Sequence, residues 1–357
     1  MSIGIFTPYS LDPIHPRLEM LCSVLKQHGL SISIINNSQK ETFFSRWGKR
    51  LFLGFYDIAA VLKSIKAIDR FDLIYVQDMA YLPLILFAKI KGKIIIYETL
   101  DNNVYLRFYN LVTEYSIFKN FFFIRSFFKK IEKLVSQKLA HCTIVNSKAL
   151  NKYFSGKAFI LYYSSPFEKI PMRTKTERAS NKPVNFIYLG WFCKSKGALD
   201  ILRFIEKYEI DCWIFGTITE KEIRKLVYEN EYIHFYDRME SSFLKIELIK
   251  LRESYDLLGF SLIKNVHYSF STQESNKDID YIAMGVPIIG NHRGPTESKI
   301  LAGCGIFYEN ELEIVALLKD ARRRSQLAQN CKKLYAKHYS QKIYESRLMA
   351  LINGLAI

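Results

Sequence analysis

Short runs of apolar residues alternate along the whole sequence with longer stretches in which apolar residues recur every three or four positions. Continuous apolar runs are typical of strands covered on both faces, and the periodic stretches are typical of amphipathic helices. The predicted strands are SIGIF, SISIIN, FDLIYVQD, KIIIYE, CTIVNS and FILYYS, followed by NFIYLGW, DCWIFGT, YIHFYD, DLLGFSLI, VPIIGN and GIFYE. This alternation predicts an α/β fold with doubly wound parallel sheets.

A polar segment with two prolines, residues 169–183, interrupts the alternation, and we interpret it as a linker. The sequence therefore predicts two tandem Rossmann-like domains, over residues 1–168 and 184–335, that face a cleft. Residues 336–357 are predicted to form a C-terminal helix that crosses back to the first domain. The 357 residues are enough for two hydrophobic cores.

Ligands of open parallel sheets bind at the carboxyl ends of the strands, so functional residues are expected just after the strands. In the second half, Gly190 ends a strand, and Lys194 and Lys196 precede the next helix. A lysine near a helix N-terminus favours phosphate binding, because backbone N–H groups, the helix dipole and an ammonium group converge there. The alternative is that these lysines are simply solvated. The sequence has no glycine-rich dinucleotide motif and no P-loop.

Two further motifs follow later strands of the second half. Asn276 and Lys277 open a predicted helix, and Asp280 lies one turn into it, where a carboxylate can accept hydrogen bonds from two ribose hydroxyls. Gly294 and Glu297 follow the next strand, where a glycine lets the backbone approach a ligand closely. We expect all five residues to contribute to the binding of a nucleotide.

The order of these motifs resembles the GT-B glycosyltransferases, in particular the large retaining group called glycosyltransferase family 4. The resemblance is carried by YLGWFCKSKG, NKDIDYIAMGVPII and NHRGPTE, and more loosely by HPRLEMLCSVLKQHGLSISIIN, FDLIYVQD and LAHCTIVNSKA in the first half. It implies that Lys196 binds the donor phosphate, that Asp280 binds the donor ribose and that Gly294 lines the donor sugar. It also implies a retaining transfer from a nucleoside diphosphate sugar, with no metal or other cofactor.

Two positions depart from the family pattern. Trp191 stands where the family has an arginine, and Lys194 is the nearest residue that could replace that cation by its reach. Thr272 stands where the family has the first of two paired glutamates, and Glu274 is the nearest carboxylate. We therefore take Glu274 as a catalytic candidate.

Four residues after strands of the first half are candidates for acceptor contact or for orientation of the donor sugar. His15 and Arg17 follow the first strand, and Glu98 and Asp101 end or follow the fourth. The two carboxylates are also catalytic candidates. The alternative is that Glu98 and Asp101 only cap the following helix.

The chain is basic, with 51 Lys and Arg against 35 Asp and Glu, and residues 1–170 carry 23 of the former and 12 of the latter. Between Ile117 and Leu139, one apolar stripe of a predicted helix would face the core, while aromatic and basic side chains fall outside it. This predicted membrane face consists of Lys119, Phe122, Phe123, Lys129, Lys130 and Lys133. Such a face suits an anionic membrane, although a helix buried on more than one side would have the same pattern.

These features together predict a glycosyltransferase of bacterial-type surface polysaccharide assembly, in the cytoplasm and peripheral on the inner face of the cell membrane. Its expected partners are a nucleotide sugar, a glycan or polyprenyl-linked acceptor and an anionic membrane surface. Nucleic acid is not expected, because the sequence contains no known nucleic-acid module. The alternatives are a sugar-nucleotide epimerase on the same fold and a catalytically degenerate homologue that acts as a scaffold. The sequence leaves the donor sugar, its base, the acceptor and the linkage open.

Overall fold

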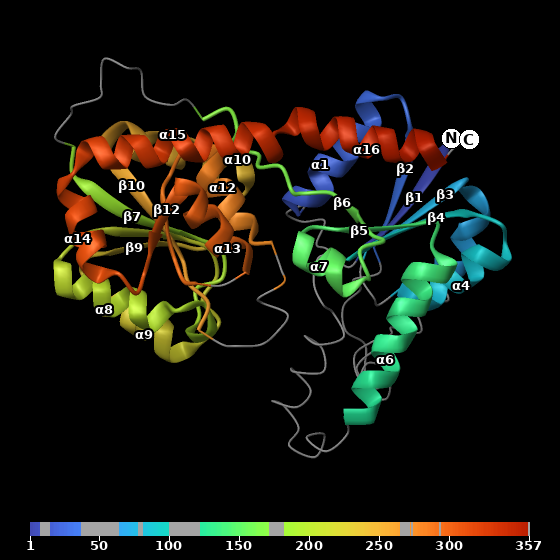
Figure 1. Ribbon diagram of the computed structural model, residues 1–357, viewed down its shortest axis with the longest axis horizontal. Coiled ribbons are helices and arrows are strands. Elements are labelled where there is room, and N and C mark those ends of the chain that lie inside the picture. The colour runs from blue at the N-terminus through green and yellow to red at the C-terminus, as the bar shows by residue number, and fades with distance from the viewer. Residues whose placement is uncertain are drawn as a thin grey trace. The chain divides into compact units, whose positions relative to one another are not determined.

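The computed structural model describes residues 1–7, 15–36, 64–77, 81–99, 122–170, 182–264, 272, 274–292 and 294–355. The chain divides into two compact units (Figure 1). Unit 1 consists of Met1–Tyr162, His267–Glu274 and Glu345–Ile357, and unit 2 consists of Tyr163–Val266 and Ser275–Tyr344. Each unit is a parallel sheet with helices on its faces, so the predicted α/β architecture is confirmed.

The sheet of unit 1 has six parallel strands in the order β2-β1-β3-β4-β5-β6. The strands are β1 (Ser2–Thr7), β2 (Ser31–Asn36), β3 (Leu73–Gln77), β4 (Ile94–Thr99), β5 (Cys142–Val145) and β6 (Phe159–Ile160). The described helices of this unit are α1 (Pro16–Gln27), η1 (Ile68–Arg70), α4 (Leu82–Ile90), α6 (Phe122–Leu134), η4 (Val135–Leu139) and α7 (Lys148–Tyr153). The buried residues of β1, β3 and β4 are continuous apolar runs, as a sheet covered on both faces requires.

The sheet of unit 2 also has six parallel strands, in the order β12-β11-β10-β7-β8-β9. The strands are β7 (Val184–Leu189), β8 (Cys212–Phe215), β9 (Ile233–Tyr236), β10 (Asp256–Ser261), β11 (Ile288–Gly290) and β12 (Gly305–Phe307). The helices are η6 (Lys194–Lys196), α8 (Ala198–Tyr208), α9 (Lys221–Glu229), α10 (Ser241–Ser254), α12 (Asn276–Met284), α13 (Gly294–Lys299), η7 (Ile300–Cys304), α14 (Glu311–Lys319) and α15 (Ala321–His338).

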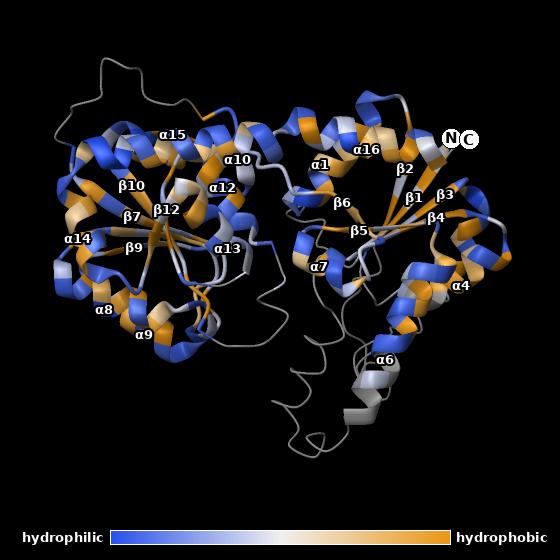
Figure 2. Ribbon diagram, in the orientation of Figure 1, coloured by the Kyte–Doolittle hydropathy of each residue, from blue (hydrophilic) through white to orange (hydrophobic). Residues whose placement is uncertain are grey.

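Hydropathy follows this layered arrangement in both units (Figure 2). The strands are mainly hydrophobic, and the helices are hydrophobic on the side that meets the sheet. The core of unit 2 includes aromatic side chains that pack across β7, α8 and β10: Phe186 lies 5.6 Å from Phe204 and 4.7 Å from Phe260 between ring centroids. All twelve described strands coincide with the predicted apolar runs.

The end of the chain returns to unit 1, as predicted. Helix α16 (Gln341–Leu355) begins in unit 2, and its residues from Glu345 onward belong to unit 1. There His28 Nε2 lies 2.8 Å from Glu345 Oε1, and the Arg347 guanidinium lies 5.2 Å from the centroid of the Phe159 ring. Among the residues that the structure describes, no helix combines the length and the apolar character needed to cross a membrane.

Candidate functional site

The carboxyl ends of the unit 2 strands form one connected rim. The backbone N–H of Lys264, after β10, donates to the carbonyl of Ser195, after β7, over 2.9 Å. The backbone N–H of Ile263 donates over 2.7 Å to Oδ1 of Asn291, which follows β11. Because these loops are bonded to one another, the side chains they carry are held in fixed positions along a single edge of the sheet.

Two of the predicted lysines supply positive charge to this rim. Lys277 is the second residue of α12, a helix whose N-terminus has no side-chain cap, and its Nζ lies 3.1 Å from the hydroxyl of Tyr188. Burial and the positive charge of Lys196 lower the pKa of Lys277 to about 7. Like charges beside an uncapped helix N-terminus are an arrangement that a bound anion stabilises.

The third lysine, Lys194, is paired with carboxylates of neighbouring loops and helices. Its Nζ forms an ion pair with Glu222 on α9, and its backbone N–H donates over 3.0 Å to Glu220. The hydrogen bond to Glu222 raises the pKa of Lys194, and both side chains are exposed. The sequence predicts that both Lys194 and Lys277 bind the donor. In the structure Lys194 forms an ion pair with a carboxylate, whereas Lys277 contacts a tyrosine hydroxyl.

Asp280 lies on α12 and accepts a hydrogen bond from Ser165 Oγ over 2.7 Å. Burial raises its pKa to about 7, against the opposing effect of hydrogen bonds from Ser165 and Tyr163. Ser165 is itself held through its backbone N–H, which donates to the hydroxyl of Tyr335 over 3.2 Å. Asp280 is thus already hydrogen-bonded to the segment that precedes β7.

A carboxylate that the sequence analysis did not single out lies two residues before Asp280. Asp278 is fully buried and accepts hydrogen bonds from Ser261 over 2.5 Å and from Thr296 over 2.6 Å. The ammonium of Lys299, also buried, lies 3.7 Å from the same carboxylate. This cluster joins β10, α12 and α13 and fixes the start of α12, and its sequence signal is only an acidic residue in the first turn of a helix.

The remaining predicted donor-site residues lie along the same rim. Asn276 is the first residue of α12, and Gly190, with a φ of +100°, follows β7. Gly294, with a φ of +52°, is the first residue of α13. Glu297 lies 3.6 Å from Nδ1 of His292, whose ring stacks on Phe307 at 3.4 Å between centroids.

Glu274, a predicted catalytic residue, belongs to unit 1 and is buried, with 4% of its surface exposed. Close to it in the chain, the carbonyl of Thr272 accepts a hydrogen bond from Ser147 Oγ, which also caps α7. Thr272 is therefore tied to the residues that follow β5.

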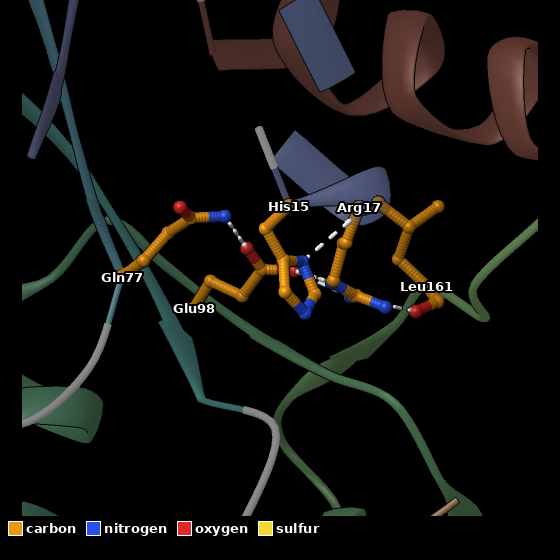
Figure 3. Close-up of polar contacts among 5 residues, drawn as sticks. All are labelled: His15, Arg17, Gln77, Glu98 and Leu161. Atoms are coloured by element: carbon orange, nitrogen blue, oxygen red, sulfur yellow. Dashed lines mark hydrogen bonds and ion pairs between the residues drawn. The ribbon is translucent and has the colours of Figure 1, made fainter. Parts of the chain in front are cut away.

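The carboxyl edge of the unit 1 sheet carries a buried ion pair (Figure 3). Glu98, on β4, lies between Arg17 and Gln77: Arg17 Nε donates to its Oε1 over 2.8 Å, and Gln77 Nε2 donates to its Oε2 over 2.5 Å. Arg17 and Glu98 are each only 1% exposed. Both carboxylate oxygens of Glu98 accept hydrogen bonds from these two residues. Because its partners are side chains of α1 and β3, Glu98 joins three elements of the unit.

Helix α1 positions Arg17 within this cluster. Pro16 starts the helix, and the His15 ring caps it by accepting from the backbone N–H of Arg17 over 3.3 Å. The second Arg17 amino group reaches the carbonyl of Leu161, after β6, at 3.4 Å. The fourth candidate of this half, Asp101, lies outside the described residues.

Two buried oxygens near this cluster have no hydrogen-bond donor in the described part of the chain. They are Gln77 Oε1, at the end of β3, and Asn146 Oδ1, directly after β5. Both residues are about 98–99% buried. An unsatisfied buried acceptor is costly, so these atoms are positions where a hydroxyl group of water or of a ligand is stabilised.

The predicted membrane face on α6 is described only in part. Lys119 and the side chains of Phe122 and Phe123 lie outside the described residues. The ammonium groups of Lys129 and Lys133 lie 5.4 and 5.2 Å from the centroid of the buried Tyr153 ring, and Lys130 is exposed. The predicted core stripe is supported where it can be seen, because Ile131 and Val135 pack in the core of unit 1.

The strand-end residues of unit 2 are suited to an anion, and those of unit 1 to hydroxyl groups.

Within the described ranges, no group of three His, Cys, Asp or Glu side chains could hold a metal ion. No protein-family model matches the sequence. No curated protein matches it significantly.

Solved structures match the fold over the whole chain. A UDP-forming α,α-trehalose-phosphate synthase from Burkholderia xenovorans has a TM-score of 0.66 at 8% identity, covering 100% of this chain and 99% of that one. AviGT4, a glycosyltransferase involved in avilamycin A biosynthesis, has a TM-score of 0.54 at 10% identity, covering 100% and 98%. A UDP-GlcNAc 2-epimerase from Neisseria meningitidis has a TM-score of 0.56 at 12% identity, covering 99% of each. The chain therefore has the GT-B fold of these glycosyltransferases.

Proposed function

We propose that the protein is a glycosyltransferase that takes its sugar from a nucleoside diphosphate sugar. The observation that carries this proposal lies at the carboxyl edge of the unit 2 sheet: Lys277 is in the first turn of α12, where Ser275 makes no side-chain cap, and the positive charge of Lys196 acts on it. A diphosphate is a compact anion that such a site suits. The fold is shared with a synthase described as UDP-forming and with a UDP-GlcNAc 2-epimerase.

In this mechanism the main task of the protein is to stabilise the leaving diphosphate. The bond between the anomeric carbon and the diphosphate oxygen breaks, and a bond to the acceptor hydroxyl oxygen forms. The acceptor proton passes to the leaving phosphate, so no protein base is needed in a retaining transfer. Lys196, Lys277 and the first N–H groups of α12 stabilise the negative charge that develops on the diphosphate. Asp280 accepts from the ribose hydroxyls, sharing or replacing its bond to Ser165.

The acceptor is proposed to bind at the carboxyl edge of unit 1. The buried oxygens of Gln77 and Asn146 accept hydrogen bonds only, and hydroxyl groups of a glycan are donors of that kind. Arg17 and Glu98 hold Gln77 in place rather than contact the acceptor directly. This arrangement supports a glycan acceptor over an apolar one.

We further propose that the acceptor is attached to a lipid and that the protein binds it at an anionic membrane. Besides the basic face of α6, helix α4 exposes Leu86, Phe87 and Ile90, the last with 74% of its surface accessible. Lys89 and Lys91 lie at the end of the same helix and are exposed. Apolar side chains flanked by lysines favour binding to an anionic lipid surface. Membrane attachment on the cytoplasmic side and a role in surface polysaccharide assembly rest on this proposal.

The direct test measures release of nucleoside diphosphate from labelled nucleotide sugars, with and without a polyprenyl-phosphate-linked glycan. We expect release that depends on the acceptor. If the protein neither turns over nor binds any of UDP-, GDP-, CDP- or dTDP-sugars, the proposal is wrong. Pelleting with vesicles that contain anionic lipid tests the membrane part, since Leu86→Ser/Ile90→Ser should pellet less than the parent protein.

Two alternatives have specific observations behind them. The fold is shared with a UDP-GlcNAc 2-epimerase, so isomerisation of the donor without any acceptor would favour an epimerase. Trp191 and Thr272 depart from the family pattern given above, so donor binding without turnover would favour a degenerate homologue that acts as a scaffold.

A further inference from the structure

Trp191 is an exposed tryptophan at the carboxyl edge of the unit 2 sheet. It follows β7 and Gly190, and 67% of its surface is accessible. Within the described residues, its indole ring makes no aromatic, cation–π or hydrogen-bonding contact that would account for its position. A large aromatic side chain usually buries most of its area, so an isolated exposed indole at a ligand-binding edge is a candidate contact for a ligand.

The backbone that carries Trp191 is firmly held. The hydroxyl of Tyr188 donates to the carbonyl of Trp191 over 2.6 Å. On either side, the N–H of Gly190 donates to Phe215 over 2.8 Å, and the N–H of Phe192 donates to Thr217 over 3.1 Å. Phe192 is itself fully buried. The exposed ring therefore projects from a backbone fixed at both neighbours, which lowers the entropy lost when a ligand binds to it.

The same tyrosine links Trp191 to the anion site. The Tyr188 hydroxyl donates to the carbonyl of Trp191 and accepts from Nζ of Lys277 over 3.1 Å. A single hydroxyl group thus separates the backbone of Trp191 from the ammonium that we assign to the diphosphate. A ligand whose phosphate binds Lys277 therefore lies near the backbone that carries this tryptophan.

We propose that Trp191 stacks against the sugar ring of the donor, the ring bonded directly to the diphosphate. This inference rests on the proposed function, because it takes a nucleoside diphosphate sugar as the ligand. The transferred sugar is joined to the diphosphate by a ring carbon, its anomeric carbon. The ribose is joined through its exocyclic C5′ and is assigned to Asp280, and the base lies farther away still. Trp191 is therefore a specificity-determining residue: it selects sugars that present a flat C–H face and aligns the anomeric carbon.

The experiment compares pairs of ligands that differ only in the sugar: UDP with UDP-glucose and GDP with GDP-mannose. Wild type, Trp191→Ala and Trp191→Phe are titrated with both members of the pair that binds wild type. We expect Trp191→Ala to weaken the nucleotide sugar roughly two- to tenfold, as for other aromatic contacts, and to leave the nucleoside diphosphate unchanged. Trp191→Phe should keep part of the effect.

Trp213 provides a matched control, because it lies in the same unit and stacks on His234 at 4.2 Å between ring centroids. Indole fluorescence should change on binding of the nucleotide sugar in Trp47→Phe/Trp213→Phe, where Trp191 is the remaining tryptophan, and should not change in Trp47→Phe/Trp191→Phe. Melting temperatures of the Trp191 variants should equal that of wild type, since an exposed ring contributes little to the core.

The outcomes separate this inference from the proposed function. If wild type binds a nucleotide sugar and Trp191→Ala binds it equally well, the stacking role is wrong and the proposed function stands. If Trp191→Ala weakens UDP or GDP as much as the nucleotide sugar, the ring in contact belongs to the nucleoside and the assignment to the transferred sugar is wrong. If wild type binds none of these four probes and no other UDP-, GDP-, CDP- or dTDP-sugar, both proposals are wrong.

Discussion

The carboxyl edges of the two sheets place their charges in opposite ways. In unit 1 the guanidinium of Arg17 is matched by Glu98, and both are almost fully buried. In unit 2 the ammonium of Lys277 is bound to the neutral hydroxyl of Tyr188 and is destabilised by the charge of Lys196. A matched buried pair holds elements of a fold together, whereas like charges close together are relieved when an anion binds. The first edge therefore depends on its own partners, and we propose that the second depends on a ligand.

The largest effect is expected from breaking the pair in unit 1. Glu98→Gln leaves the buried guanidinium of Arg17 without a counter-charge, which should lower the free energy of unfolding by about 3–5 kcal/mol. Chemical denaturation of the variant and the parent measures this difference. An Arg17→Met/Glu98→Leu double variant removes both charges and should recover much of the loss. Equal stability of Glu98→Gln and wild type would contradict the assignment of this pair as a structural one.

The equivalent change in unit 2 should act on binding and not on folding. Lys277→Met removes the ammonium that we propose binds the diphosphate, so the dissociation constant for a nucleoside diphosphate should rise roughly 10- to 100-fold. The melting temperature without ligand should stay the same or increase, because a half-buried cation beside Lys196 is lost. Isothermal titration and thermal melting test both statements. A large loss of stability with unchanged binding would mean that Lys277 stabilises the fold, as Arg17 and Glu98 do, and does not bind the anion.

The pH dependence of anion binding tests the role of Lys277 in a second way. The pKa of Lys277 is lowered to about 7, and a phosphate anion binds the protonated ammonium more tightly. The affinity for inorganic pyrophosphate should therefore be full below about pH 7 and fall as the pH rises through this value, by roughly tenfold at pH 8–9. Lys277→Met, measured in parallel, corrects for the titration of pyrophosphate itself and should lack this component. An identical pH profile in the two proteins would count against the role of Lys277.

The parallel sheets could be predicted because their strands are continuous apolar runs, a local property of the sequence. The hydrogen-bond and ion-pair partners of the site residues could not be predicted, because they depend on how distant elements pack together. Glu98 and Arg17 are 81 residues apart, and the sequence places both only at strand ends. Asp278 and Asp280 are neighbours on one helix, yet one is enclosed by Ser261 and Thr296 and the other meets Ser165. The family pattern singles out only Asp280.

The smallest loss of affinity is expected when Lys194 is replaced. The ammonium of Lys194 is paired with Glu222, and both side chains are exposed, so solvent screens the pair. Lys194→Ala should change the affinity for a nucleoside diphosphate by no more than about twofold, and Glu222→Gln should leave the melting temperature unchanged within error. Lys196→Ala, compared directly, should weaken binding more, because the charge of Lys196 already acts on Lys277. If Lys194→Ala weakens binding as strongly as Lys277→Met, Lys194 leaves Glu222 for the ligand, and it then supplies the cation missing at Trp191.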